Sequence, residues 1–137
     1  MRLRIHTPLE VVVDQADVRS VRAEDATGSF GILGGHEDFL TTLPVSVVSW
    51  TDVRGEPRYC AVRGGVLTVT DGEAVAVATR EAVVGTDLER LHRDVLARLE
   101  AAREAERSER FESTQLHLAA IREITRHLRQ ARRRESP

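Results

Sequence analysis

Apolar and polar residues alternate in short runs over the first 85 residues of the chain. Leu3 and Ile5 alternate with charged neighbours, and Asp71-Gly72 separates two later runs as a hairpin signal. A period of two is typical of half-buried strands, so about ten short antiparallel strands predict a β sandwich over residues 1–85. The β-branched runs lie at 11–13, 18–23, 45–50, 59–62, 66–69, 74–78 and 82–84.

The hydrophobic period lengthens to three and four after Thr86. Thr86 and Glu89 have the spacing of a capping box, and Asp87 suits the positive end of a helix. A polar stretch at 107–110 separates two apolar stripes, which predicts an antiparallel α-helical hairpin over residues 86–137. The stripes are Leu88, Leu91, Val95, Leu99 and Ala102, then Leu116, Ala120, Ile121, Ile124 and Leu128.

Small residues mark one of the predicted strands. Ala74, Ala76 and Ala78 alternate with Val75 and Val77. This pattern predicts a strand covered on both faces, and the outer cover would be a second sheet or a partner subunit.

Composition limits the classes of function. With 137 residues and 41% hydrophobic content, the chain can form one compact domain with an appendage. A net charge of −2 argues against a nucleic-acid binder, and Cys60 alone permits no internal disulfide. No apolar run approaches the roughly 20 residues needed to span a bilayer, and there is no signal-peptide region. We therefore expect a soluble, unexported chain that meets a membrane only through other subunits.

Glycines concentrate in residues 27–43, TGSFGILGGHEDFLTTL. Their density between apolar residues predicts shaped turns that present Ser29, His36, Glu37 and Asp38 at one rim. A P-loop is disfavoured because the chain has no lysine. His36 could begin a metal site or, with Glu37 or Asp38, a small hydrolase site, but a turn histidine that bonds to backbone groups is favoured.

Two motifs resemble the epsilon subunit of F-type ATP synthases. The first is Gly-x-Phe-Gly-Ile-Leu-x-Gly-His followed by an apolar-Leu-Thr-x-Leu run, and the second is VRGGVLTV at 62–69. The resemblance covers essentially the whole chain and extends to the alternate, N-type branch of these enzymes. The chain departs from the family at Gly34, where proline is usual, and at Glu37-Asp38, where Ala-Pro is usual.

The resemblance implies a non-catalytic rotor subunit in the central stalk. Such subunits couple ion flow through the c-ring to ATP synthesis, lie on the cytoplasmic face of the bacterial membrane in the F1 sector, and contact gamma, the c-ring and the alpha/beta hexamer. It implies no catalytic residue, no metal and no required cofactor. The residues that match the family's partner-binding regions are Gly28, Ser29, Phe30, Gly31, His36, Gly64 and Gly65. A non-catalytic β-sandwich adaptor in another complex is the alternative.

The second predicted helix has an arginine face, formed by Arg122, Arg126, Arg129 and Arg133. At 100° per residue these side chains project together, either into solvent or toward an acidic partner. In the family that this chain resembles, the C-terminal helices regulate ATP hydrolysis. The resemblance therefore implies that the acidic partner would be the catalytic subunits. Some relatives bind ATP through an Asp-x-x-Arg motif; Asp87 and Arg90, with Arg122 and Arg126, match it in part, so ATP stays an alternative ligand.

Overall fold

The computed structural model describes residues 1–135, with side chains described as far as Arg132. It divides into two compact units, Met1–Ala101 and Ala102–Pro137. The first unit contains eight strands: β1 (Arg2–His6), β2 (Val11–Gln15), β3 (Val18–Asp25), β4 (Gly28–Leu33), β5 (Phe39–Asp52), β6 (Pro57–Thr70), β7 (Ala74–Ala78) and β8 (Ala82–Gly85).

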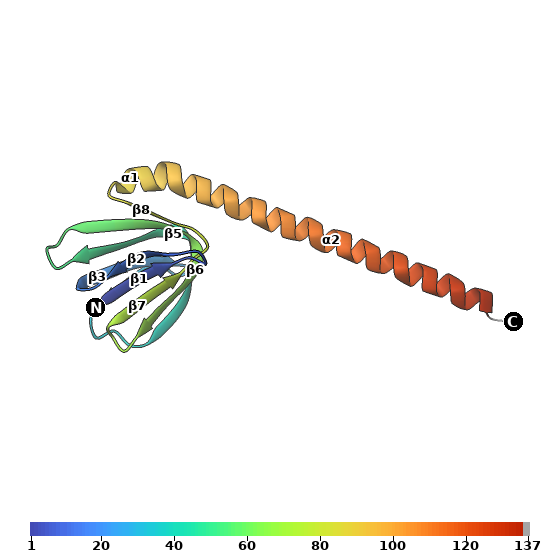
Figure 1. Cartoon of the computed structure of the whole chain (residues 1–137), viewed down its shortest axis with the longest axis horizontal. Helices are drawn as coiled ribbons and strands as arrows, with labels where there is room; N and C mark the ends of the chain where they lie inside the picture. Colours follow the sequence, from blue (N-terminus) through green and yellow to red (C-terminus); the bar gives the residue numbers. More distant parts are fainter. Residues whose placement is uncertain (136–137) are drawn as a thin grey trace. The chain divides into compact units, whose positions relative to one another are not determined.

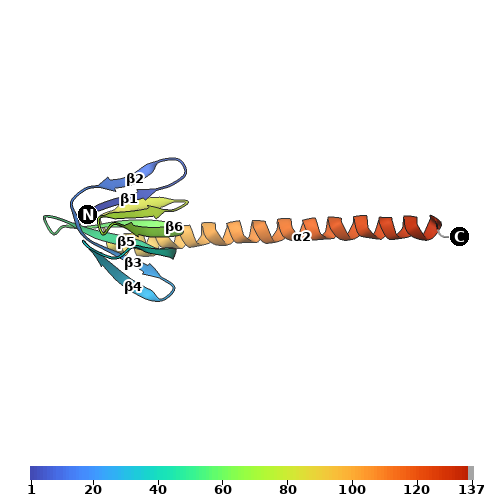
Figure 2. The same cartoon turned by 90° about the horizontal axis from the view of Figure 1, so that it is seen from below.

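The strands form one sheet that folds over itself as a β sandwich. Their order is β2-β1-β7-β6-β5-β3-β4, with β8 also paired to β6. The first half of β6 pairs with β8 and the second half pairs with β7, while β5 accompanies β6 along nearly its whole length. The long strands β5 and β6 therefore contribute to both layers (Figures 1 and 2).

Alternation along the strands fills the space between the layers. Leu3 and Ile5 of β1 are fully buried, whereas Arg2, Arg4 and His6 are exposed, which confirms the predicted period of two. The indole Nε1 of Trp50 donates to Oε1 of Gln15 at 2.8 Å, so the one tryptophan joins β5 to β2. The other residues of this core include Val21, Ile32, Val48, Cys60, Val62, Leu67, Val75 and Val77.

The structure has fewer and longer strands than the sequence predicted. β5 and β6 are 14 residues each and continue through Pro44 and through Gly64-Gly65. Leu43 pairs with Gly65 and Val45 pairs with Arg63, so Pro44 faces Gly64 across the strand pair. Pro44 has no backbone N–H and Gly64 has no Cβ. Both strands bend where these two residues face each other, and neither strand ends there.

The helical segment begins one residue later than expected. Asp87 is the N-cap, since its carboxylate accepts from the backbone N of Arg90 at 3.3 Å, and Thr86 is not the cap. A short helix, α1 (Leu88–Arg90), leads into a π-helical turn, η1 (Leu91–Val95), that the sequence pattern did not reveal. Leu91 and Leu99 are buried against Ala61 of β6, on the face opposite the sandwich core.

The predicted hairpin is replaced by one continuous helix. α2 runs from Leu96 to Glu135 without a turn at 107–110 (Figure 1). No glycine or proline lies between Gly85 and Pro137, and Arg107–Glu104 and Arg110–Glu106 pairs at 3.4 Å join successive turns across the expected break. The second apolar stripe is exposed: Leu116, Ile121, Ile124 and Leu128. Within the described residues, no helix combines the length and apolar character needed to cross a bilayer.

Candidate partner interface

The rim predicted around Gly28 lies on an edge strand. β4 pairs with β3 and ends the strand order, so Gly28, Ser29, Phe30 and Gly31 all belong to the border of the sheet. Gly28 has φ +123°, a value that favours glycine, and no atom approaches the place where its Cβ would be. The backbone of this strand is accessible to a partner.

Asp25 closes the turn that precedes β4. Its Oδ1 accepts from the backbone N of Thr27 at 2.8 Å and from the Thr27 hydroxyl, and its Oδ2 accepts from the Thr41 hydroxyl at 3.0 Å. These hydrogen bonds, those from Thr27 first, lower the pKa of the Asp25 carboxyl below its usual value because they stabilise the charged form.

Three rings gather beside the rim. Phe30 meets Phe39 edge-on at 5.6 Å, and His36 meets Phe39 at 5.9 Å. His36 also contacts the Glu37 carbonyl through Nδ1 at 2.7 Å and donates its backbone N–H to Leu33 at 3.2 Å. The contacts of His36 with Glu37 and Leu33 confirm that it is a turn histidine. The ring contacts join Phe30 to His36 through Phe39, a residue that the sequence motifs did not indicate.

The loop that contains His36 is tied to the β6–β7 turn. Gly35 donates its N–H to the Gly72 carbonyl at 2.9 Å, and Asp71 donates its N–H to Oδ1 of Asp38 at 2.8 Å. A Cβ on Gly72 would lie 2.8 Å from the Cα of Gly35. Asp38, one of the two acidic departures from the family pattern, thus has a structural role.

Gly64 and Gly65 occupy a different place, at the bend of β6. Both have positive φ, +72° and +135°, and a Cβ on Gly65 would overlap the carbonyl oxygen of Ala78. Their immediate neighbours are the end of β7 and the bend of β5 at Pro44. The sharp bend and the close approach of β7 give this glycine pair a structural role.

One outer face of the sandwich is formed by small and apolar residues. The register aligns Arg4, Ala76, Thr68 and Leu40 in one row and His6, Ala78, Val66 and Thr42 in the next. Leu40 is 68% exposed, and Ala78 and Val66 are also exposed. We call Leu40, Thr42, Val66, Thr68, Ala76 and Ala78 the small-residue face. Leu40, Thr42, Val66 and Ala78 are exposed on this face, so within the first unit it is open to a partner.

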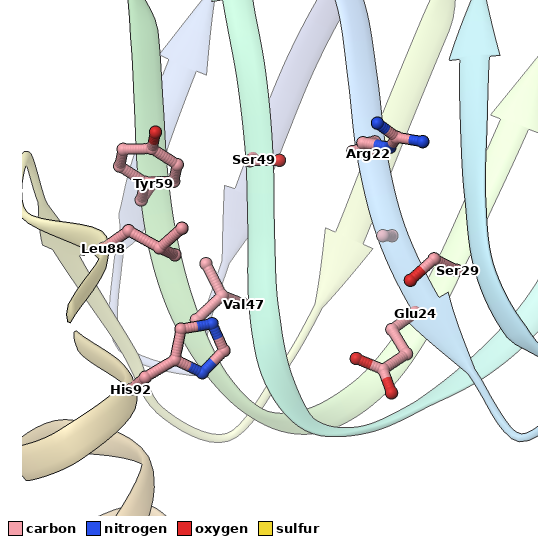
Figure 3. Close-up of a pocket in the computed structure, with 9 residues that line it drawn as sticks. Arg22, Glu24, Ser29, Val47, Ser49, Tyr59, Leu88 and His92 are labelled. Atoms are coloured by element: carbon pink, nitrogen blue, oxygen red, sulfur yellow. The ribbon is translucent and has the colours of Figure 1, made fainter.

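The opposite outer face has a shallow groove of about 180 Å³ between the sheet and α1–η1 (Figure 3). Leu88, Val47 and Tyr59 form its apolar side, and Arg22, Glu24 and Ser29 lie across from them. His92 and Ser29 come from opposite sides, so the groove does not present a paired base and nucleophile. Among the side chains that the structure describes, up to Arg132, no His, Cys, Asp and Glu residues group as a metal site.

Three of the predicted arginines share a surface of α2. Arg122, Arg126 and Arg129 line one hollow with Thr125 and Gln130, and Arg126 lies 3.8 Å from Glu123. The side chain of Arg133 is outside the described residues. The common face predicted from the helical period is therefore present for the described members.

Comparison with known proteins identifies the family. The family model described as ATP synthase, Delta/Epsilon chain, beta-sandwich domain matches residues 1–85. The ATP synthase epsilon chain 2 of Cereibacter sphaeroides is 46% identical over 131 residues, covering 96% of this chain and 90% of that protein. The chain belongs to the ATP synthase epsilon family. The epsilon chain 2 of Paraburkholderia xenovorans is 41% identical over 136 residues, with 96% and 95% coverage.

Solved structures of ATP synthases contain chains that are similar to this one. A chain in the cryo-EM structure of Euglena gracilis mitochondrial ATP synthase, OSCP/F1/c-ring, is 27% identical with a TM-score of 0.58; the match covers 74% of this chain and 62% of that one. A chain in the central stalk/c-ring structure from Tetrahymena thermophila, 16% identical with a TM-score of 0.53, shows the fold alone; coverage is 69% and 71%. Epsilon is a non-catalytic stalk subunit of the complex.

The residues of the partial ATP motif in this epsilon chain fall into separate units. Asp87 and Arg90 line a pocket of about 300 Å³ with Gly85 and Leu91, and the carboxylate of Asp87 caps the helix. Arg122 and Arg126 belong to the unit that begins at Ala102. The helix-capping alternative for Asp87 is confirmed.

Proposed function

We propose that this chain is a central-stalk rotor subunit of an F1Fo ATP synthase. In that role it couples ion flow through the c-ring to ATP synthesis and hydrolysis in F1. The similarity to epsilon chain 2 proteins over 96% of the chain is the observation that supports this most strongly. Both epsilon chain 2 relatives also support a place in the alternate branch of these enzymes.

The small-residue face fits the gamma subunit. Its alanine and threonine side chains let another backbone approach closely, and Leu40 and Val66 add apolar area. An interface that transmits torque must bury more accessible surface area than a crystal contact does, about 1,200 Å² or more in total. A sheet face can supply such an area, and the loop with His36 leads into the beginning of β5, which contributes Leu40 and Thr42 to this face.

The rim of β4 fits the c-ring. Gly28, Ser29 and Gly31 present accessible backbone, and Phe30 presents an apolar ring that is braced by Phe39. Phe30, Phe39 and His36 connect the rim of β4 to the loop that leads into β5, the strand that carries Leu40 and Thr42 of the small-residue face. Gamma and the c-ring would thus bind different surfaces of one β-sandwich unit. The complex would hold the chain at the cytoplasmic face of the membrane.

The second unit fits a regulator of ATP hydrolysis. α2 exposes Leu116, Ile124 and Leu128 on one stripe and Arg122, Arg126 and Arg129 on another surface. An amphipathic helix with exposed apolar and cationic surfaces suits an apolar groove bordered by acidic side chains. The catalytic alpha/beta hexamer is the partner that this proposal assigns to it.

Co-purification from host membranes tests the rotor role. A tagged chain should bring down gamma and c subunits, and Ala76→Arg, at the centre of the small-residue face, should reduce their recovery about tenfold or more. Ala97→Arg is the matched control, because Ala97 is exposed and lies outside that face. Recovery of the tagged chain with another complex, and without ATP synthase subunits, would favour the adaptor alternative.

A further inference from the structure

We propose that Asp25 is a positioning residue: it ties the β3–β4 turn to β5 and thereby holds the Gly28–Ser29 end of β4 in place for its partner. The inference depends on the proposed contact between this rim and the c-ring. Asp25 lies outside the glycine motif, and its carboxylate bonds both to the turn and to β5.

The two oxygens of Asp25 bind in different directions. Oδ1 stays within the turn, where it accepts from Thr27, and Oδ2 reaches the Thr41 hydroxyl at 3.0 Å. Thr41 belongs to β5 and is 16 residues away in the chain. One carboxylate therefore connects a tight turn to a strand that runs through both layers of the sandwich.

The turn needs such a tether because little else holds it. β4 is an edge strand, and Gly28 and Gly31 have no side chain to pack. Phe30 contacts Phe39, but this contact lies beyond the turn, toward the middle of β4. Without the Asp25–Thr41 hydrogen bond, the turn and Ser29 would depend on the β3–β4 ladder and on the hydrogen bonds from Thr27 to Asp25, none of which reaches β5.

Stiffness at this place matters for a rotor contact. A loop that yields under load stores or dissipates work that a firm contact would transmit, so ion flow and ATP turnover would become less tightly linked. A carboxylate that only closes a local turn would not need a partner on β5. The Thr41 contact is the observation that separates the two interpretations.

Three variants separate the tether from the local turn. Asp25→Ala removes both connections, Thr41→Val removes only the hydroxyl that reaches Oδ2, and Asp25→Asn keeps an acceptor for Thr27 and gains a donor for Thr41. Asp14→Ala is the matched control, since Asp14 is also a hydrogen-bonded carboxylate, paired with Arg2 on β1 at 2.8 Å. Amide hydrogen exchange at residues 27–30 reports the turn, and ion pumping per ATP hydrolysed in the assembled complex reports coupling.

Asp25→Ala and Thr41→Val should each speed exchange at residues 27–30 about tenfold and lower the pumping ratio at least twofold, because a lost hydrogen bond raises local opening by roughly that factor. Asp25→Asn and Asp14→Ala should stay within twofold of the parent in both measurements. Unchanged exchange in Thr41→Val would overturn the tether. Faster exchange with an unchanged pumping ratio, in complexes that retain gamma, would instead overturn the rim contact of the proposed function and with it the role of Asp25 in coupling.

Discussion

Gly65 shows how strongly one residue can be constrained by its neighbours. Its φ of +135° and the position of the Ala78 carbonyl oxygen, which a Cβ would overlap, exclude any side chain. Gly65→Ala should therefore lower the free energy of unfolding by about 2–4 kcal/mol, through backbone strain and displacement of β7. Urea unfolding of the isolated chain measures this.

Gly34→Ala is the control for that substitution. A Cβ on Gly34 would have no atom within 4 Å, and the φ of this residue is not in the left-handed region. We expect a change within about 0.5 kcal/mol. Equal losses of stability in the two variants would contradict the steric explanation.

Two carboxylates give the fold a defined response to acid. Asp14, bonded by Arg2, and Asp25, bonded by Thr27, both have a pKa below the ordinary value, because those hydrogen bonds stabilise the charged carboxylate. The unfolded chain thus binds more protons than the folded chain at low pH, so both groups stabilise the fold above about pH 4 and lose this contribution as the pH falls through their lowered folded values.

The corresponding measurement is unfolding by urea at a series of pH values. The parent should lose stability below about pH 4, and a variant with Asp14→Asn and Asp25→Asn together should show a shallower dependence on pH. Identical slopes in the two proteins would contradict this assignment of the acid response.

Residue-scale sequence reasoning succeeded where bonding is local. The turn role of His36 could be predicted because its partners are Leu33 and Glu37. The roles of Phe39 and Asp25 could not, since each depends on a partner that only the folded sheet brings near. Cys60 was also predictable from its local sequence. The apolar run around it predicted a buried structural thiol, and burial raises the pKa of this thiol to about 12.

At the scale of elements, the start of the helical segment is fastened to the sheet by a few apolar side chains. Leu99 is fully buried with Leu91 and Ala61. Leu99→Ala should lower stability by about 2–4 kcal/mol, because it leaves a cavity between η1, α2 and β6.

Leu116→Ala is the matched control on the same helix. Leu116 is 73% exposed, so its truncation should change stability by less than about 0.5 kcal/mol. Thermal unfolding monitored at Trp50 compares the two variants. A larger effect at Leu116 than at Leu99 would show that the second stripe, and not the first, is the covered one.

Elements could be predicted from alternation, but their ends could not. Period-two runs located the sandwich correctly, yet they place strand ends near Pro44 and Gly64, which instead face each other at a shared bend. The polar stretch at 107–110 resembles a turn in composition. It contains no residue that breaks a helix, and ion pairs to the preceding turns stabilise the helical form.

For the whole molecule, removal of the second unit separates assembly from regulation. A chain that ends at Ala101 retains every residue of both apolar clusters, whereas a cut after Val84 would also remove Leu91 and Leu99. Complexes with the shorter chain should assemble and should hydrolyse ATP about fivefold faster, a change of the size that coupling between two sites commonly produces.

The full-length chain with Arg122→Gln, Arg126→Gln and Arg129→Gln is the companion variant. It tests whether the arginine face, rather than the length of α2, accounts for the effect. Hydrolysis rates that are the same for the parent, the truncation and the triple variant, across ionic strengths, would rule out the regulatory role proposed for this unit.

The continuity of β5 and β6 through both layers has a mechanical consequence. In a sandwich made of two separate sheets, shear can slide one sheet over the other and is resisted only by side-chain packing. Here the peptide backbone itself crosses from one layer of the single folded sheet to the other twice, in β5 and in β6, so covalent bonds resist that sliding. A body of this kind should fail under force at its edges, at β2 or β4, before its two halves separate.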